Sequence, residues 1–342
     1  MRIQLSEHFT YSKLLRFTFP SVIMMIFTSI YSVVDGVFVS NFVGKTPFAA
    51  VNLIMPLLII LGALGFMIGT GGTAIVAKTL GEGKPELANQ YFSLLVYTGL
   101  IGGTAVGVLG ILFVRPVAAA LGAEGQMLED CVLYARIILA ANPCFILQNI
   151  FQSFFVTAEK PKLGLYVTVG AGLTNIVLDA LLVAVFPMGL AGAAAATALS
   201  QTVGGLVPIL YFLRKNDSLL RLTKTKFHGK ILLKTCANGS SELMSNISAS
   251  VVTILYNLQL MRLAGEDGIA AYGAIMYVAF IFAAIFIGYA VGSAPVISFH
   301  YGAENTDELK SLLRKSVVLT AVSGAAMALL ATLASAPLSK IF

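Results

Sequence analysis

The stretch AAVNLIMP at residues 49–56 decides the fold, because it returns 221 residues later as AAYGAIMY at residues 270–277. Further pairs at the same offset, without a gap, are Gly44 and Gly265, Gly71 and Gly292, Gly81 and Gly302, Gly103 and Gly324, and Pro116 and Pro337. Membrane helices use glycine, proline and small residues at close contacts and kinks. A long internal repeat of this kind is typical of secondary transporters, whose two halves move around a shared site.

The composition is that of a membrane protein. Mean hydropathy is +0.89, with 58% hydrophobic and 11% charged residues, whereas charged residues make up about 25% of ordinary soluble domains. The first long apolar run starts too late and is too long for a cleaved signal peptide. We therefore predict an all-α polytopic protein with nine membrane-spanning helices, at about 17–43, 48–77, 91–114, 131–157, 163–187, 190–213, 232–261, 268–299 and 316–336.

The basic residues predict the orientation of the chain. If the N-terminus is cytoplasmic and the runs alternate, 17 of the 22 Lys and Arg residues fall on the cytoplasmic side and 5 on the other. This is a positive-inside distribution. We therefore predict a multi-pass protein of the cell (inner or plasma) membrane with a cytoplasmic N-terminus. The net charge of +6 follows from this topology, so no nucleic-acid partner is expected.

One long polar stretch, residues 214–234, divides the chain. We predict an N-terminal lobe of six helices (1–215), a basic cytoplasmic linker (216–230) and a C-terminal lobe of three helices (231–342). Because six is even, both copies enter the membrane from the same side, so the two six-helix bundles should be related by a parallel repeat. The second copy reaches only the counterpart of Leu121 and is expected to be incomplete. The linker either binds anionic lipid headgroups or only sets the topology.

The sequence offers no constellation for a metal ion or a cofactor. Its three cysteines form no Cys-x-x-Cys pair, and its three histidines lie at run ends or in loops. Residues 69–73 resemble a phosphate-binding loop but lack its Gly-Lys-Ser/Thr ending. The pairs Gly65 and Gly69, and Gly103 and Gly107, have the spacing of closely packed helices. We expect neither an enzyme nor a bound cofactor.

Three acidic residues lie inside apolar runs: Asp35, Asp179 and Glu242. A charge at the bilayer centre costs about 2.5–3.5 kcal/mol, so an acid there indicates a functional site unless it is neutral or near the interface. Asn175 precedes Asp179 by four residues and shares its helix face. An amide beside a carboxylate donates to the ionised form and accepts from the protonated one. The pair is therefore a candidate proton switch or cation ligand.

Several short motifs resemble one family of transporters. They are VDGVFVS at 34–40, AVN at 50–52 with MP at 55–56, the turns AKTLGEGK at 77–84 and AEKPK at 158–162, and NIVLD at 175–179. Together they look like the multidrug and toxic compound extrusion (MATE) family, over essentially all 342 residues. The resemblance implies an efflux antiporter for cationic or amphipathic small molecules, built of two lobes that open alternately. It implies a monomer in membrane lipid once the second lobe is complete.

The resemblance also implies roles for individual residues. Asp35 and Asp179 match first-lobe acids implicated in proton coupling, and Asn175 and Thr197 match polar partners in the same pocket. Glu242 resembles an acid linked to cation binding in sodium-coupled members. We expect protons as the coupling ion, with sodium as the alternative.

Thioether and aromatic side chains suit varied ligands, although ordinary packing is the alternative for each of them here. The candidates for lining the substrate path are Met24, Met25, Tyr31, Met55, Met244, Tyr256, Met276 and Tyr277.

Three other interpretations stay open at this point. One is a flippase or exporter of lipid-linked sugars, but such cargo is anionic and only Arg136 comes near a membrane interior. Another is an intramembrane aspartyl protease using Asp35 and Asp179, but the Gly-x-Gly-Asp signature of those enzymes is absent. The third is an inactive, truncated relative, because nine helices leave the second lobe with a half-packed face.

Overall fold

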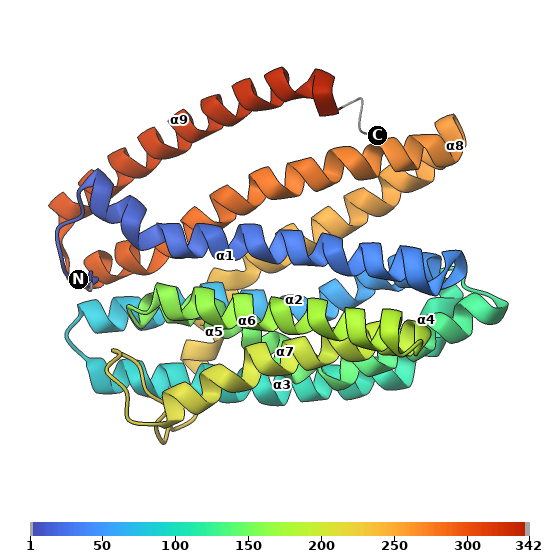
Figure 1. Cartoon of the computed structure of the whole chain (residues 1–342). Coiled ribbons are helices and arrows are strands. Elements are labelled where there is room, and N and C mark those ends of the chain that lie inside the picture. The colour runs from blue at the N-terminus through green and yellow to red at the C-terminus, as the bar shows by residue number, and fades with distance from the viewer. Residues whose placement is uncertain (1–2, 339–342) are drawn as a thin grey trace.

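The computed structural model describes the backbone of residues 3–338. Side chains are described except at 32–33, 37, 40, 45, 254, 257–258, 260–262, 264–275, 277–278 and 333–338. Figure 1 shows a bundle of long helices, which confirms the all-α prediction for the described chain. The α-helices are α1 (Tyr11–Phe38), α2 (Lys45–Gly81), α3 (Pro85–Ala120), α4 (Gly125–Ala140), α5 (Asn142–Thr157), α6 (Pro161–Asp179), α7 (Gly189–Leu213), α8 (Gly229–Gly302) and α9 (Thr306–Leu338). Two π-helices, η1 (Val39–Val43) and η2 (Ala180–Val185), follow α1 and α6.

The membrane-spanning helices of the described chain differ from the prediction in one place. The described residues contain seven helices that are long and apolar enough to cross a membrane, or eight if a bent pair counts as one span. The bent pair is α4 and α5, which meet at 55°, so the prediction of one continuous helix over 131–157 is wrong. The break falls beside Pro143, which has no N–H to continue the helix. The predicted run 232–261 extends into the part of α8 whose side chains lie outside the described residues, so this span stays a prediction.

Helix α8 runs out and back. Gly239 lies against Met67 and Gly302 lies against Lys78, so both ends of α8 contact the same half of α2. A straight helix would separate the two glycines by about 95 Å. Figure 1 shows the reversal at the end of the bundle opposite the N-terminus. We call residues 229–253 the first arm of α8 and residues 279–302 its second arm; they correspond to the predicted runs 232–261 and 268–299.

The repeat produces a reciprocal contact between α2 and the second arm of α8. A Cβ on Gly81 would lie 2.0 Å from the carbonyl oxygen of Phe299, and a Cβ on Gly302 would lie 2.0 Å from that of Lys78. The offset of 221 pairs Gly81 with Gly302 and Lys78 with Phe299, so the same contact is made once from each copy. This is the geometry of two parallel repeats around an axis along the helices. We call the contacts of α1 and α2 with α8 the lobe seam.

Glycines also bring the helices of the first lobe together. Gly65 and Gly69 lie against Ile146 and Asn149 of α5, where an added Cβ would lie 2.9 and 3.1 Å from the nearest backbone atoms. Gly103 lies against Pro143, and Gly107 against Leu139. The predicted packing role of both glycine pairs is therefore confirmed, and both pairs face the bent α4–α5 segment.

Residues 3–10 form what we call the amino-terminal strap, which crosses the seam. Leu5 and Phe9 are fully buried and pack with Val156 of α5 and Val296 of α8. The backbone N–H of Leu5 donates to Glu159 Oε1 at 2.7 Å, in the turn between α5 and α6. The strap therefore contacts both sides of the seam.

Glu308 of α9 receives the other end of the strap. The N–H of Phe9 donates to Glu308 Oε1 at 2.9 Å, and His8 Nδ1 lies 2.5 Å from Glu308 Oε2. Lys315 Nζ donates to the Phe9 carbonyl oxygen. These bonds fasten the strap to the C-terminal part of the chain.

Candidate functional site

Four of the predicted site residues converge inside the first lobe. Asp35 comes from α1, Asn175 and Asp179 from α6, and Thr197 from α7. Asn175 Nδ2 donates to Thr197 Oγ1 at 3.4 Å, and Thr197 Oγ1 donates to Asp35 Oδ1 at 3.5 Å. Asn175 and Asp179 are 1% and 0% exposed, whereas Asp35 and Thr197 are partly buried, so the α6 side of the cluster is the enclosed one.

Gly172 explains how α1 reaches α6. An added Cβ there would lie 2.5 Å from the ring of Phe27 and 2.9 Å from that of Tyr31, so only glycine permits this approach. One turn beyond Tyr31 lies Asp35, and one and two turns beyond Gly172 lie Asn175 and Asp179. The two helices run in the same direction, which places the acids at the same level.

Both acids stand just before a change of helix type. The α1 helix becomes the π-helix Val39–Val43 one turn after Asp35, and α6 becomes the π-helix Ala180–Val185 directly after Asp179. Short π segments inside α-helices are rare and are frequent at functional sites. Neither π-helix can be foreseen from the sequence, since no residue type marks a π turn.

The cluster has more acceptor oxygens than hydrogen-bond donors. The carboxyl groups of Asp35 and Asp179 are close enough for their charges to interact. Neither carboxyl oxygen of Asp179 accepts a hydrogen bond, and Asn175 Oδ1 has no hydrogen-bond partner either. A buried acceptor without a donor costs about 1–3 kcal/mol. A proton or a small cation supplied from outside would satisfy these oxygens.

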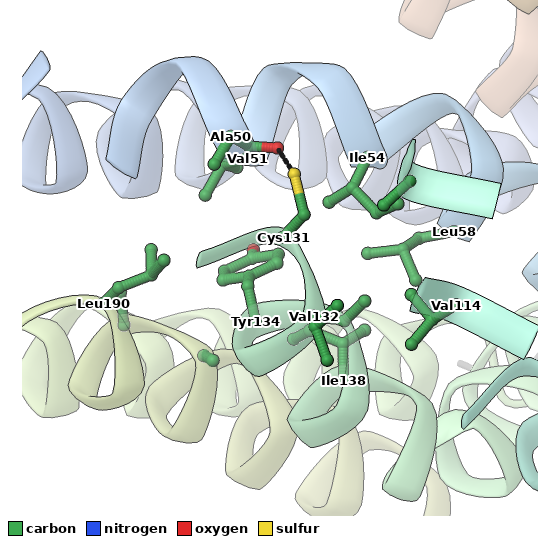
Figure 2. Packing of buried hydrophobic residues seen from close by; sticks show 14 of the residues in the cluster. Ala50, Val51, Ile54, Leu58, Val114, Cys131, Val132, Tyr134, Ile138 and Leu190 are labelled. Atoms are coloured by element: carbon green, nitrogen blue, oxygen red, sulfur yellow. Dashed lines mark hydrogen bonds between the residues drawn. The ribbon is translucent and has the colours of Figure 1, made fainter. Parts of the chain in front are cut away.

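Two polar residues near the cluster were missed by the sequence analysis. Tyr134 of α4 is 1% exposed and interacts with Thr197 and with both carboxyl groups. Figure 2 shows its ring among apolar side chains of α2 and α7, beside Cys131, whose thiol donates to the Ala50 carbonyl oxygen at 3.4 Å. Gln148 of α5 is 5% exposed, interacts with Tyr31, and has no partner for its Oε1 atom. Gln148 is one of several amides inside an apolar run, and that pattern could have marked it as a candidate site residue. A single tyrosine such as Tyr134 has no comparable pattern in the sequence.

Glu242 lies away from this cluster. It follows Gly239 by three residues on the first arm of α8, beside the lobe seam. Its counterpart in the first repeat is Ser21, which precedes Asp35 by fourteen residues, about 21 Å along a helix. Any role of Glu242 is therefore separate from that of the two aspartates.

The proposed lining residues have mixed surroundings. Met24 is buried at 1% exposure, whereas Met244 and Tyr256 are each 53% exposed. Met25, Tyr31, Met55 and Met276 are partly buried, and Tyr277 lies outside the described side chains. Their part in substrate binding stays a prediction. Arg136, the basic residue nearest a membrane interior in the sequence, is exposed.

Within the part of the chain whose side chains are described, no group of three or more His, Cys, Asp and Glu residues could hold a metal ion. Membrane-length helices, two parallel repeats and a buried acid pair define a polytopic membrane transport protein. The family model MatE matches residues 20–181 and 243–342. The chain belongs to the MatE family of MATE transporters.

Relatives agree with this assignment. The chain is 27% identical over 310 residues to the multidrug export protein MepA of Staphylococcus saprophyticus, covering 90% of this chain and 68% of that protein. It is 26% identical over 318 residues to MepA of Staphylococcus haemolyticus, covering 92% and 70%.

Solved structures share the fold. A MATE protein crystallised in complex with MaD3S superposes with a TM-score of 0.90 at 23% identity, covering 98% of this chain and 76% of that one. The outward-facing conformation of a multidrug resistance MATE family transporter of the MOP superfamily gives a TM-score of 0.90 at 22% identity, covering 98% and 74%.

Proposed function

We propose that this protein exports cationic and amphipathic small molecules across the cell membrane, in exchange for protons, by alternating access. Membership of the MatE family and the similarity to two multidrug export proteins support export of varied compounds. The observation that carries the exchange is the cluster of Asp35, Asp179, Asn175 and Thr197, in which Asn175 and Asp179 are buried. Exchange requires a site whose affinity for substrate changes with its ion occupancy.

The cluster can couple a proton to a cation through charge alone. A carboxylate within the membrane is costly, at about 2.5–3.5 kcal/mol, and two adjacent carboxylates repel each other. Either a proton or a cationic substrate relieves this repulsion, so the two compete. One charge crossing 100 mV releases about 2.3 kcal/mol, which sustains a concentration ratio of more than tenfold. Sodium is the alternative coupling ion.

The lobe seam and the amino-terminal strap supply the barrier in this mechanism. With the N-terminus in the cytoplasm, as the basic residues predict, the glycine contacts of Gly81 and Gly302 close the cytoplasmic end. Opening to the cytoplasm must separate these contacts and release Leu5 or Phe9 from one side. Closure at one end and opening at the other is the rocking motion of repeat-built transporters.

The test is efflux of ethidium by proteoliposomes that contain the full chain, with a pH gradient or a sodium gradient imposed separately. The variant Asp179→Asn keeps the shape of the side chain but removes its charge, and it should abolish proton-driven efflux. Glu124→Gln is the matched control, because Glu124 is exposed and makes no side-chain hydrogen bond at the start of α4.

Normal proton-driven efflux by a correctly inserted Asp179→Asn protein would contradict the proposed role of the cluster in proton coupling. Efflux that is driven by a sodium gradient alone, and that is lost in Asp179→Asn, would identify sodium and not the proton as the coupling ion. No efflux from the unaltered chain under either gradient would contradict the proposed export.

A further inference from the structure

The strongest feature outside the acid cluster is a basic surface where residues 214–234 connect α7 to α8. Its cations are all exposed: Arg214, Lys215, Arg221, Lys224, Lys226, Lys230 and Lys234. None of the seven makes an ion pair with a described residue. Asp217, the acid of this segment, pairs with Lys160 at 2.6 Å instead. The surface therefore carries uncompensated positive charge.

This segment is held firmly against the first lobe. The N–H of Arg221 donates to Asn89 Oδ1 at 2.7 Å, and the N–H of Thr223 donates to Ser93 Oγ at 2.8 Å. Leu220, directly before Arg221, is fully buried. The backbone that carries Arg221 and its neighbours is consequently held in place by the fold, which a segment serving only as a topology signal does not require.

A cavity of about 620 Å³ opens between the end of α7 and this segment. Leu210 and Tyr211 line one part of its wall, and the cationic residues Arg214 and Lys215 line another. Asn216 and Asp217 complete the lining. A cavity with these two kinds of wall fits an amphipathic anion better than a free inorganic ion.

An exposed apolar stripe on α7 leads to the cavity. Leu206, Leu210 and Leu213 are 44%, 55% and 59% exposed, and their spacing places them on one helix face. Lipid chains can lie along such a stripe, and Arg214 and Lys215 follow it directly in the sequence. Phe227, which is 81% exposed, adds an aromatic ring to the same segment.

We propose that this cavity binds an anionic phospholipid, with its phosphate between Arg214 and Lys215 and an acyl chain along Leu206, Leu210 and Leu213. Guanidinium and ammonium groups are the usual partners of phosphate oxygens. Each cation near an anionic membrane strengthens binding by about fivefold, so the pair accounts for roughly thirtyfold. The site is independent of drug transport and of the acid cluster.

The test is native mass spectrometry of the purified full chain, equilibrated with equal amounts of phosphatidylglycerol and phosphatidylcholine in detergent. The unaltered protein should retain one phosphatidylglycerol preferentially. Arg214→Gln with Lys215→Gln should weaken this retention roughly thirtyfold. The matched control is Lys224→Gln with Lys226→Gln, which removes the same charge from the same segment but not from the cavity wall, and it should retain the lipid.

Equal loss in both double variants would overturn the site, because it would show a diffuse charge effect. Retention in both would overturn it as well. Leu210→Asn keeps every charge and should also weaken phosphatidylglycerol binding. Displacement of the lipid by millimolar inorganic phosphate would indicate a phosphate site without an acyl-chain subsite and would contradict the proposal. Thermal unfolding without added lipid checks that each variant is folded.

Discussion

Replacing Phe9 by alanine should loosen the lobe seam at the end of the bundle that carries the N-terminus. Phe9 is fully buried, and its ring meets that of Phe17 edge-on, with centroids 5.7 Å apart. The cluster around it includes Val156 from the first lobe and Val296 from α8. Truncating a buried phenylalanine to alanine costs about 3–5 kcal/mol. A terminal strap can partly collapse into the space, so about 3 kcal/mol is the appropriate magnitude.

This loss should act on the equilibrium between lobe arrangements. The strap contacts both sides of the seam only while the lobes are together. An arrangement with separated lobes keeps the contact of Phe9 with Phe17 of α1 but loses the contacts across the seam, so the substitution destabilises it less. A difference of up to about 3 kcal/mol corresponds to roughly two decades in an equilibrium constant. A closed state favoured by about 99 to 1 would become nearly equal to the open one.

The assay is pulsed electron spin resonance between labels at Lys162 and Lys310, which are exposed on either side of the seam. The three native cysteines are free and are replaced first. Phe9→Ala should add a longer distance of about equal weight, whereas Tyr11→Ala, at a side chain 42% exposed, should not. An unchanged distance distribution in folded Phe9→Ala protein would refute the reasoning.

Two further predictions concern packing and the acid cluster. Gly302→Leu should lower the thermal unfolding temperature, because its Cβ would lie 2.0 Å from the Lys78 carbonyl oxygen and overpacking costs about 1–3 kcal/mol. The control is Gly170→Leu, since Gly170 has open space around it. Equal unfolding temperatures for the two variants would contradict the reciprocal contact. Tyr134→Phe removes only a hydroxyl beside the two carboxyl groups, so it should shift the pH at which efflux is half-maximal while stability changes by about 1 kcal/mol. Tyr97→Phe, at an exposed position, should leave the pH profile unchanged, and an unchanged profile in Tyr134→Phe would exclude an influence on the acids.

The sequence predicted those parts of the structure that depend on local spacing. The four-residue interval between Asn175 and Asp179 placed them on one face of α6, and the glycine intervals in α2 and α3 marked real helix contacts. Spacing carries no information on which helices meet. That Asp35 joins Asn175 and Asp179 depends on Gly172, whose contact with Phe27 and Tyr31 could be recognised only after folding.

Irregular backbone was the other part that the sequence did not reveal. The bend between α4 and α5 follows from Pro143, but proline also occurs inside the continuous helices α1, α2 and α3. Whether a proline ends a helix depends on neighbours that can bond the freed backbone groups. The π-helices after Asp35 and Asp179 are likewise set by packing.

The two copies of the repeat share the glycines that pack at the seam but do not share the acidic residues. Gly81 and Gly302 make the same contact from the two copies, yet the counterpart of Asp35 is Tyr256 and the counterpart of Glu242 is Ser21. A symmetric seam allows the two lobes to rock without favouring either one. Under the proposed exchange, the ion occupancy of acids in one lobe would then affect a contact surface that both lobes share. Protonation of Asp35 would act on the seam most directly through α1, which carries Asp35 and also contacts α8 at Gly288 and Gly292. Substitutions in the middle of α1 should therefore uncouple proton binding from lobe movement while leaving each of them intact.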